Sequence, residues 1–172
     1  MAYTYSKIAT YTVGSSGVSN ITFLNIPQNY TDLCLLLSFR AVNSGSAGYD
    51  FYADMSFNGS TSNASFRRLA GYITTVNSDT GSRLYAASFL GSTGTASTFG
   101  NAQVYIPNYA GSNNKSYSGE SAAETNTTSN YLDMTAGLWS NTAAITSITL
   151  TPSAGNFAQY SSAHLYGIKA EL

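Results

Sequence analysis

The segment FYADMSFNG, residues 51–59, decides the fold class. Apolar and polar residues alternate along it, and a period of two is typical of a β-strand with one buried face. The apolar positions are Phe51, Ala53, Met55 and Phe57. Asn58-Gly59 follows, a pair that tolerates the positive φ angles required at both central positions of a type I′ turn. The segment therefore predicts a half-buried strand that ends in a tight reversal.

The same pattern extends over the whole chain. Runs rich in β-branched and aromatic residues are separated by clusters of Gly, Ser, Asn, Asp and Thr. The predicted strands cover residues 3–13, 20–26, 32–42, 51–57, 66–76, 83–90, 101–106, 115–122, 131–139, 144–150 and 163–172. Helical periodicity is weak, and only 141–145 suggests a short helical turn. We predict one all-β domain over residues 1–172, an antiparallel β-sandwich or jelly roll of about 8–11 strands with little or no helix.

Several residues have an expected place in this fold. The apolar run Leu33–Leu37 predicts a strand buried on both faces, in the centre of a sheet or beneath a neighbouring subunit. It contains the only cysteine, Cys34, which excludes a disulfide within the chain and is expected to be a small buried group. Trp139 is expected in the core. Arg67 and Arg68 are neighbours on a strand and should point to opposite faces. The candidate partners of the arginines are Asp50, Asp54 and Asp79.

Charged side chains are scarce. They make up 9% of the 172 residues, and the formal net charge is −1. Without a basic excess, the chain is not suited to neutralising nucleic-acid phosphates or binding an acidic membrane surface. No apolar run approaches the ~18–20 residues of a membrane-spanning helix, and residues 1–7 do not resemble a signal peptide. We therefore expect synthesis in a cytoplasm and neither nucleic-acid nor membrane partners. Weak charge repulsion also leaves copies of the chain free to associate.

The polar groups are mostly uncharged, and they offer no recognisable catalytic motif. Ser, Thr and Asn number 26, 20 and 15. The single histidine, His164, cannot form a zinc site alone and is expected to be structural. Glu120 and Glu124 could be a carboxylate pair of a glycosidase, but their polar, small neighbours favour a solvated strand edge. We predict no catalytic residue, no cofactor and no metal site, and hence a protein that is not an enzyme.

Tyrosine is the most informative residue type for binding. Tyr3, Tyr5 and Tyr11 have the same parity in the first predicted strand, and three more surround the loop 108–116, namely Tyr105, Tyr109 and Tyr117. Tyrosine is enriched at protein interfaces because it buries a large area at a low entropic cost. Aromatic rings also stack on sugars. These six residues are therefore candidate interface or glycan contacts, and filling of the sandwich core is the alternative for each.

Several segments carry a family resemblance. They are ITFLNIPQNYTDL (21–33), LLLSFR (35–40), FNG (57–59), NAQVYIPNY (101–109), AAITSITL (143–150) and HLYGI (164–168). Together they resemble a domain of virion proteins of tailed bacteriophages, especially phages of cyanobacteria and other aquatic bacteria. The matching segments span almost the whole chain and consist of strand cores and turns.

The resemblance implies a jelly-roll component of the phage virion. It suggests a head decoration, or cement, protein that binds the major capsid protein, stabilises the shell and forms a homotrimer. The alternative is a module of a tail or head fibre that recognises host surface glycans. A hydrolase that uses Glu120 and Glu124 is the third hypothesis.

Overall fold

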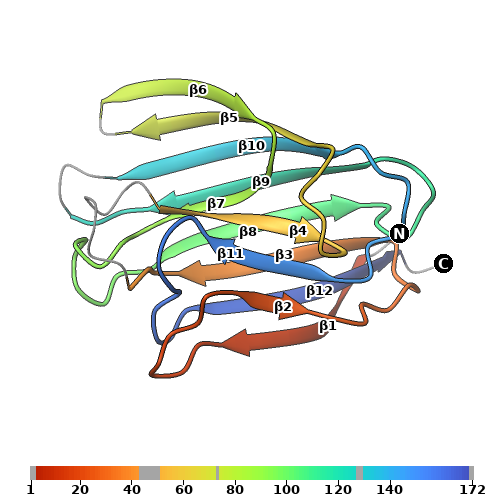
Figure 1. The fold of residues 1–172 in the computed structure, drawn as a ribbon, viewed down its shortest axis with the longest axis horizontal. Helices are drawn as coiled ribbons and strands as arrows, with labels where there is room; N and C mark the ends of the chain where they lie inside the picture. The colour runs from red at the N-terminus through yellow and green to blue at the C-terminus, as the bar shows by residue number, and fades with distance from the viewer. Residues whose placement is uncertain (1–2, 43–50, 73, 127–129, 171–172) are drawn as a thin grey trace.

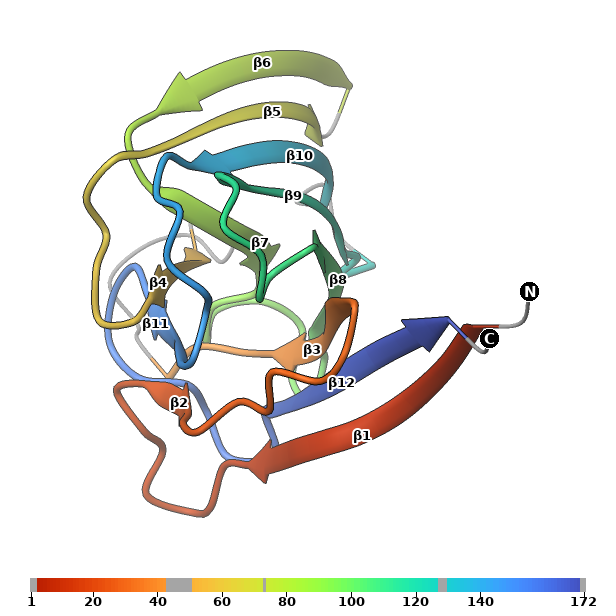
Figure 2. The same ribbon diagram turned by 90° about the vertical axis from the view of Figure 1, so that its right-hand side faces the viewer.

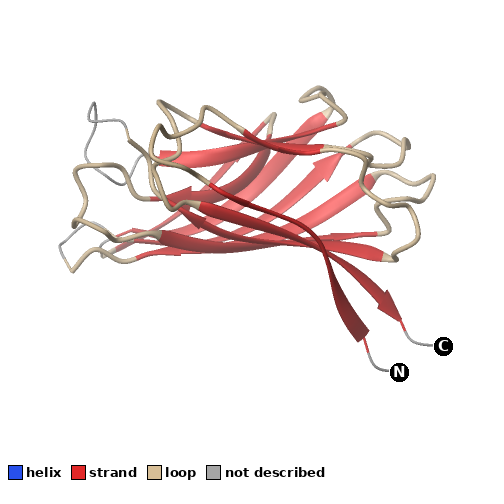
Figure 3. Ribbon diagram, turned by 90° about the horizontal axis from the view of Figure 1, so that it is seen from below, coloured by secondary structure: helices blue, strands red, loops and turns tan. Residues whose placement is uncertain are grey.

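A computed structural model describes residues 3–42, 51–72, 74–126 and 130–170. These residues form strands and loops, without a helix among them, and therefore without one long and apolar enough to cross a membrane (Figure 3). The strands are β1 (Tyr3–Thr12), β2 (Ile21–Phe23), β3 (Asp32–Phe39), β4 (Phe51–Phe57), β5 (Ala64–Tyr72), β6 (Thr75–Gly81), β7 (Leu84–Phe89), β8 (Gly100–Pro107), β9 (Lys115–Ala123), β10 (Tyr131–Trp139), β11 (Ile148–Pro152) and β12 (Ser162–Ala170).

The strands form two antiparallel sheets that pack face to face (Figures 1 and 2). The larger sheet has eight strands in the order β1-β12-β3-β8-β9-β10-β5-β6, and the smaller has four in the order β2-β11-β4-β7. The predicted all-β class and antiparallel sandwich of jelly-roll type are confirmed. The strand ends nearest the two termini, on β1 and β12, project beyond the rest of the sandwich (Figure 3). We call the side of the larger sheet that is turned away from the smaller sheet the outer face.

The hydrophobic core lies between the sheets. The smaller sheet contributes the alternating apolar side of β4, as its sequence predicts, and each of these side chains is buried. Trp139 from the larger sheet packs edge-to-face on Phe57, with ring centroids 5.6 Å apart, and its predicted core position is confirmed. Cys34 is buried as expected. Leu36 of the same strand is partly exposed, so β3 is not fully buried on its outer side.

The turn after β4 has the predicted geometry. Asn58 and Gly59 have φ angles of 53° and 72°, and Phe57 and Ser60 exchange two backbone hydrogen bonds across them. The side chain of Asn58 then organises a distant loop: its Oδ1 accepts from the backbone N–H of Thr146, at 2.8 Å, and that of Ser147. These bonds hold the chain in an irregular loop before β11. The predicted strand 144–150 is thus observed only as Ile148–Pro152, and 141–145 has no helical turn.

The largest difference from the predicted elements is a hairpin. The predicted strand 66–76 is the end of β5 followed by the start of β6, and β6 continues to Gly81 through residues that resemble a turn. Strand β6 lies at the edge of its sheet, and most of its side chains are exposed. An exposed edge strand needs no apolar residues, so its sequence lacks the alternation that identifies a strand.

Candidate binding surface

Two of the predicted contact tyrosines are part of the core. Tyr109 is 0% exposed and its hydroxyl donates to the carbonyl of Pro27, and Tyr117 is 3% exposed with its ring against Gly137. The prediction that these two residues contact a partner or glycan is therefore wrong, because their rings fill the sandwich. Tyr105 differs: it is half-buried on the outer face, and its hydroxyl donates to Asp32 Oδ2 at 2.7 Å.

The prediction that the N-terminal tyrosines lie on one face of the first strand is also wrong for Tyr11. The register between β1 and β12 shifts between Lys7 and Ala9, so an extra residue reverses the alternation within β1. Tyr5 lies on the side of Tyr166, with ring centroids 6.4 Å apart, whereas Tyr11 is paired with Ala163 and lies on the opposite side. Both are exposed. The side chain of Tyr3 lies outside the described residues.

The residues considered for catalysis do not form a site. His164 shares a hydrogen bond with the Thr10 hydroxyl on the neighbouring strand. Strand β9 ends at Ala123, and the Glu124 carboxylate accepts from the next two backbone N–H groups, which lowers its pKa. Glu124 therefore caps a turn instead of facing a substrate with Glu120. Within the described residues, no group of three or more His, Cys, Asp or Glu is placed to hold a metal ion.

The strongest electrostatic cluster lies between the sheets. Arg68 donates to both carboxylate oxygens of Asp79 at 2.9 Å, and its Nη1 lies 3.7 Å from Asp133 Oδ2. The same Asp133 oxygen accepts from the hydroxyls of Tyr85 and Ser121, at 2.9 and 3.2 Å. Burial, followed by the charge of Asp133, raises the pKa of Tyr85. The predicted pairing of an arginine with Asp79 is confirmed. Asp133 Oδ2 thus holds groups from both sheets together, whereas Asp133 Oδ1 is buried without a hydrogen-bond partner among the described residues.

A second ion pair confirms the candidate partner Asp54. The Arg83 Nε atom lies 3.5 Å from Asp54 Oδ1. Burial raises the pKa of Asp54 to about 6, and the positive charge of Arg83 opposes part of that rise. Arg83 also lies over the ring of Tyr52, 4.2 Å from its centroid, and 5.2 Å from the ring centroid of Phe66 on β5. Arg83, which directly precedes β7, therefore contacts β4 of the smaller sheet and β5 of the larger one.

The outer face has an unusual composition along β10. The apolar residues of this strand alternate, as in a strand with one buried face, but they point away from the core. Leu132 and Met134 are 63% and 65% exposed, whereas Asp133 is 1% exposed. The inward side of β10 instead carries Asp133, whose carboxylate pairs with Arg68, followed by Thr135 and Trp139. Exposed apolar residues continue on both sides of β10, at Leu69 on β5, Val76 on β6 and Leu36 on β3.

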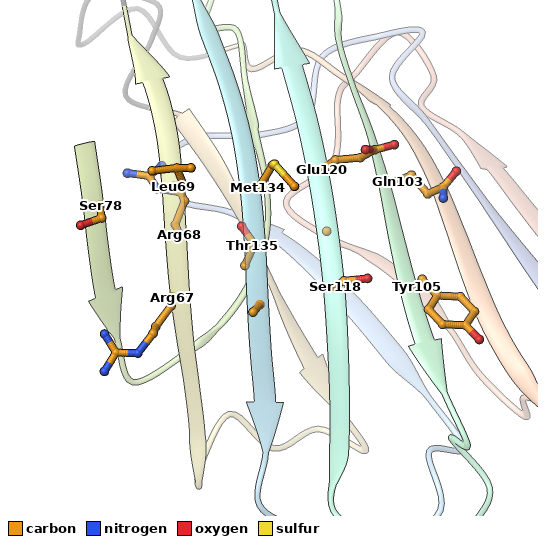
Figure 4. Close-up of a pocket in the computed structure, with 12 residues that line it drawn as sticks. Arg67, Arg68, Leu69, Ser78, Gln103, Tyr105, Ser118, Glu120, Met134 and Thr135 are labelled. Carbon is orange, nitrogen blue, oxygen red and sulfur yellow. The ribbon is translucent and has the colours of Figure 1, made fainter. Parts of the chain in front are cut away.

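Strand register aligns these side chains across the sheet. One row of directly paired residues runs Leu36, Gln103, Glu120, Met134, Leu69 and Ser78. The next row runs Cys34, Tyr105, Ser118, Ala136, Arg67 and Thr80. Small side chains occupy the middle of the second row and longer ones surround them, which produces a hollow of about 590 Å³ (Figure 4). The outer face thus combines exposed apolar groups with a shallow depression.

Sequence reasoning did not find this surface. Its signal is the alternation Leu132, Met134, Ala136, Leu138 within 131–139, but periodicity alone does not tell whether the apolar side of a strand faces the core or a partner. Trp139 and Asp133 decide which side of β10 faces the core. The partners of Asp133 come from distant segments, so local periodicity does not reveal this orientation.

Comparison with known proteins gives no relative for this chain. No family model matches it, and searches of curated proteins and of solved structures also find no match.

Proposed function

We propose that the chain is a non-enzymatic structural protein of a phage particle, a head decoration protein that assembles through the outer face of its eight-stranded sheet. The observation that carries this proposal is the outward apolar side of β10, with Leu132 and Met134 almost two-thirds exposed. A monomeric protein rarely leaves a contiguous apolar surface in water, and such a patch is typical of a protein interface.

The remaining support comes from the sequence. The matching segments resemble domains of phage virion proteins, and this resemblance is the basis for placing the protein on a particle. A formal net charge of −1 allows copies to crowd together on a repetitive shell. Symmetry then multiplies each contact, so weak individual contacts add up to a stable coat. The proposed partners are the major capsid protein and further copies of the chain, as in the homotrimer that the resemblance implies.

Recognition of a host surface glycan by a fibre module is the second candidate. It is favoured by the hollow beside Tyr105, which also presents the polar side chains of Gln103 and Glu120. The large aliphatic residues Leu69, Leu132 and Met134 favour a protein partner, because a sugar needs hydrogen bonds at most of its surface.

Replacing the apolar side of β10 tests the assembly proposal. We expect the double substitution Leu132→Ser and Met134→Ser to weaken binding to expanded heads that lack the protein by about 30- to 1,000-fold, because each exposed apolar group contributes on the order of 1–2 kcal/mol when a partner covers it. Binding is measured by co-sedimentation with heads and by the melting temperature of the shell.

The matched control is Leu24→Ser, since Leu24 is equally exposed but lies in the loop after β2. It should bind like the wild type. If the wild-type protein never joins heads and leaves their melting temperature unchanged, the decoration function is refuted. Binding to host polysaccharide that Gln103→Ala abolishes would support the fibre module instead.

A further inference from the structure

The outer face carries one positive and one negative side chain on its most apolar part. Among the outward residues of β8, β9, β10, β5 and β6, the charged ones are Arg67 on β5 and Glu120 on β9. They lie on either side of β10: Arg67 is paired with Ala136, and Glu120 is paired with Met134 (Figure 4). Both side chains are exposed, and neither has an ion pair or hydrogen bond within the described part of the chain. The face therefore presents two unpaired and opposite charges across an apolar centre.

The same face carries both a protrusion and a depression. Met134 is 65% exposed and stands beside the hollow, and the middle of that hollow is lined by the small residues Ser118 and Ala136. The space beside Met134 leaves room for the Met134 side chain of a rotated copy of the same surface. Such self-complementarity is the requirement for a two-fold interface, in which one patch contacts the identical patch on its partner.

We propose that the direct occupant of the outer face is a second copy of this chain, related by a two-fold axis near Met134 and Ala136. That axis lies in the plane of the face, so Arg67 of each copy faces Glu120 of the other and the two Met134 side chains meet beside the axis. This inference rests on the proposed function only for the choice of the face, and it replaces the homotrimer that the resemblance implies with a two-fold pair. In a two-fold interface the patch meets its own copy, so a positive and a negative side chain within one patch can pair twice across the axis.

The available area is sufficient for a specific contact. Strands spaced ~4.8 Å apart, with about seven residues each at ~3.3 Å, give an eight-stranded face on the order of 900 Å². Standard protein interfaces cover ~800 Å² on each partner. The low overall charge of the chain imposes little repulsion on such a pair.

Charge reversal tests the arrangement with the purified protein. Light scattering after size exclusion, and sedimentation over a range of concentrations, give the mass and the dissociation constant of the pair. We expect a dimer for the wild type. Arg67→Glu alone and Glu120→Arg alone should each raise the dissociation constant at least about 10-fold, because each places two like-charged contacts in the interface. The double variant Arg67→Glu with Glu120→Arg should restore the wild-type constant.

The control is Lys169→Glu on β12, an exposed charge reversal outside these five strands, and it should leave the dissociation constant unchanged. A wild-type monomer at all concentrations, a trimer, or a double variant as weak as the single variants would overturn the two-fold arrangement. Head binding by a protein that stays monomeric would refute this inference and leave the decoration function standing. A charge-dependent dimer that never joins heads would refute the decoration function and leave the dimer standing.

Discussion

Alanine in place of Gly137 is expected to lower the free energy of unfolding by about 3 kcal/mol or more. A Cβ atom at this position would lie 2.0 Å from two ring carbons of Tyr117 on the neighbouring strand. The ring cannot move aside, because it is buried and packs edge-to-face against Phe57, with ring centroids 6.5 Å apart. The substitution therefore forces the two sheets apart or expels the tyrosine from the core.

Urea unfolding followed by far-ultraviolet circular dichroism measures this loss. The matched control is Gly14→Ala, since a Cβ there has no neighbour within 4 Å and the backbone is not in the left-handed region. The control should change the free energy of unfolding by no more than about 0.5 kcal/mol. Equal stabilities of the two variants would show that Tyr117 does not occupy the space above Gly137.

Asp133→Ala is expected to cost about 3–5 kcal/mol, a loss typical of removing one partner from a buried ion pair. The carboxylate of Asp133 accepts from the hydroxyls of Tyr85 and Ser121 and lies 3.7 Å from Arg68. Its removal takes one partner from each of these groups in the interior, because Asp133 is 1% exposed. Unfolding in urea at neutral pH, compared with the wild type, gives the magnitude.

Asp79→Ala is the matched control for this cluster. Asp79 binds the same arginine with two hydrogen bonds, but its side chain is 43% exposed, so water replaces much of what it contributes. We expect a cost of about 1 kcal/mol for Asp79→Ala. If the two substitutions destabilise the protein equally, the buried position of Asp133 in the larger sheet is not correct.

The sequence predicts an element best where its local pattern and its tertiary surroundings agree. Residues 51–57 and 131–139 were predicted with the observed bounds, because both alternate and both end at a clear turn. Strand β6 was missed because an exposed edge imposes no apolar period. The reversal within β1 was missed because a bulge adds a residue without a sequence signal, and it separated Tyr5 from Tyr11.

The binding surface was less predictable than the fold. Tyrosine content pointed to Tyr109 and Tyr117, yet both rings are enclosed by the two sheets. Composition shows which residue types suit an interface. Only the packing of the two sheets shows which of these side chains are exposed on the surface. On β10 the decisive contacts of Asp133 and Trp139 join residues far apart in the chain, so the outward position of Leu132 and Met134 is a property of the tertiary structure.

The rate of oxidation of Met134 by hydrogen peroxide, followed by mass spectrometry of proteolytic fragments, tests most directly whether the outer face is a contact surface. Exposed methionine is oxidised readily, and Met55, which is 1% exposed, supplies an internal reference. We predict rapid oxidation of Met134 in dilute protein and a rate at least about 10-fold lower in concentrated protein and on decorated heads, with Met55 slow throughout. Equal rates of Met134 oxidation under all three conditions would contradict the account.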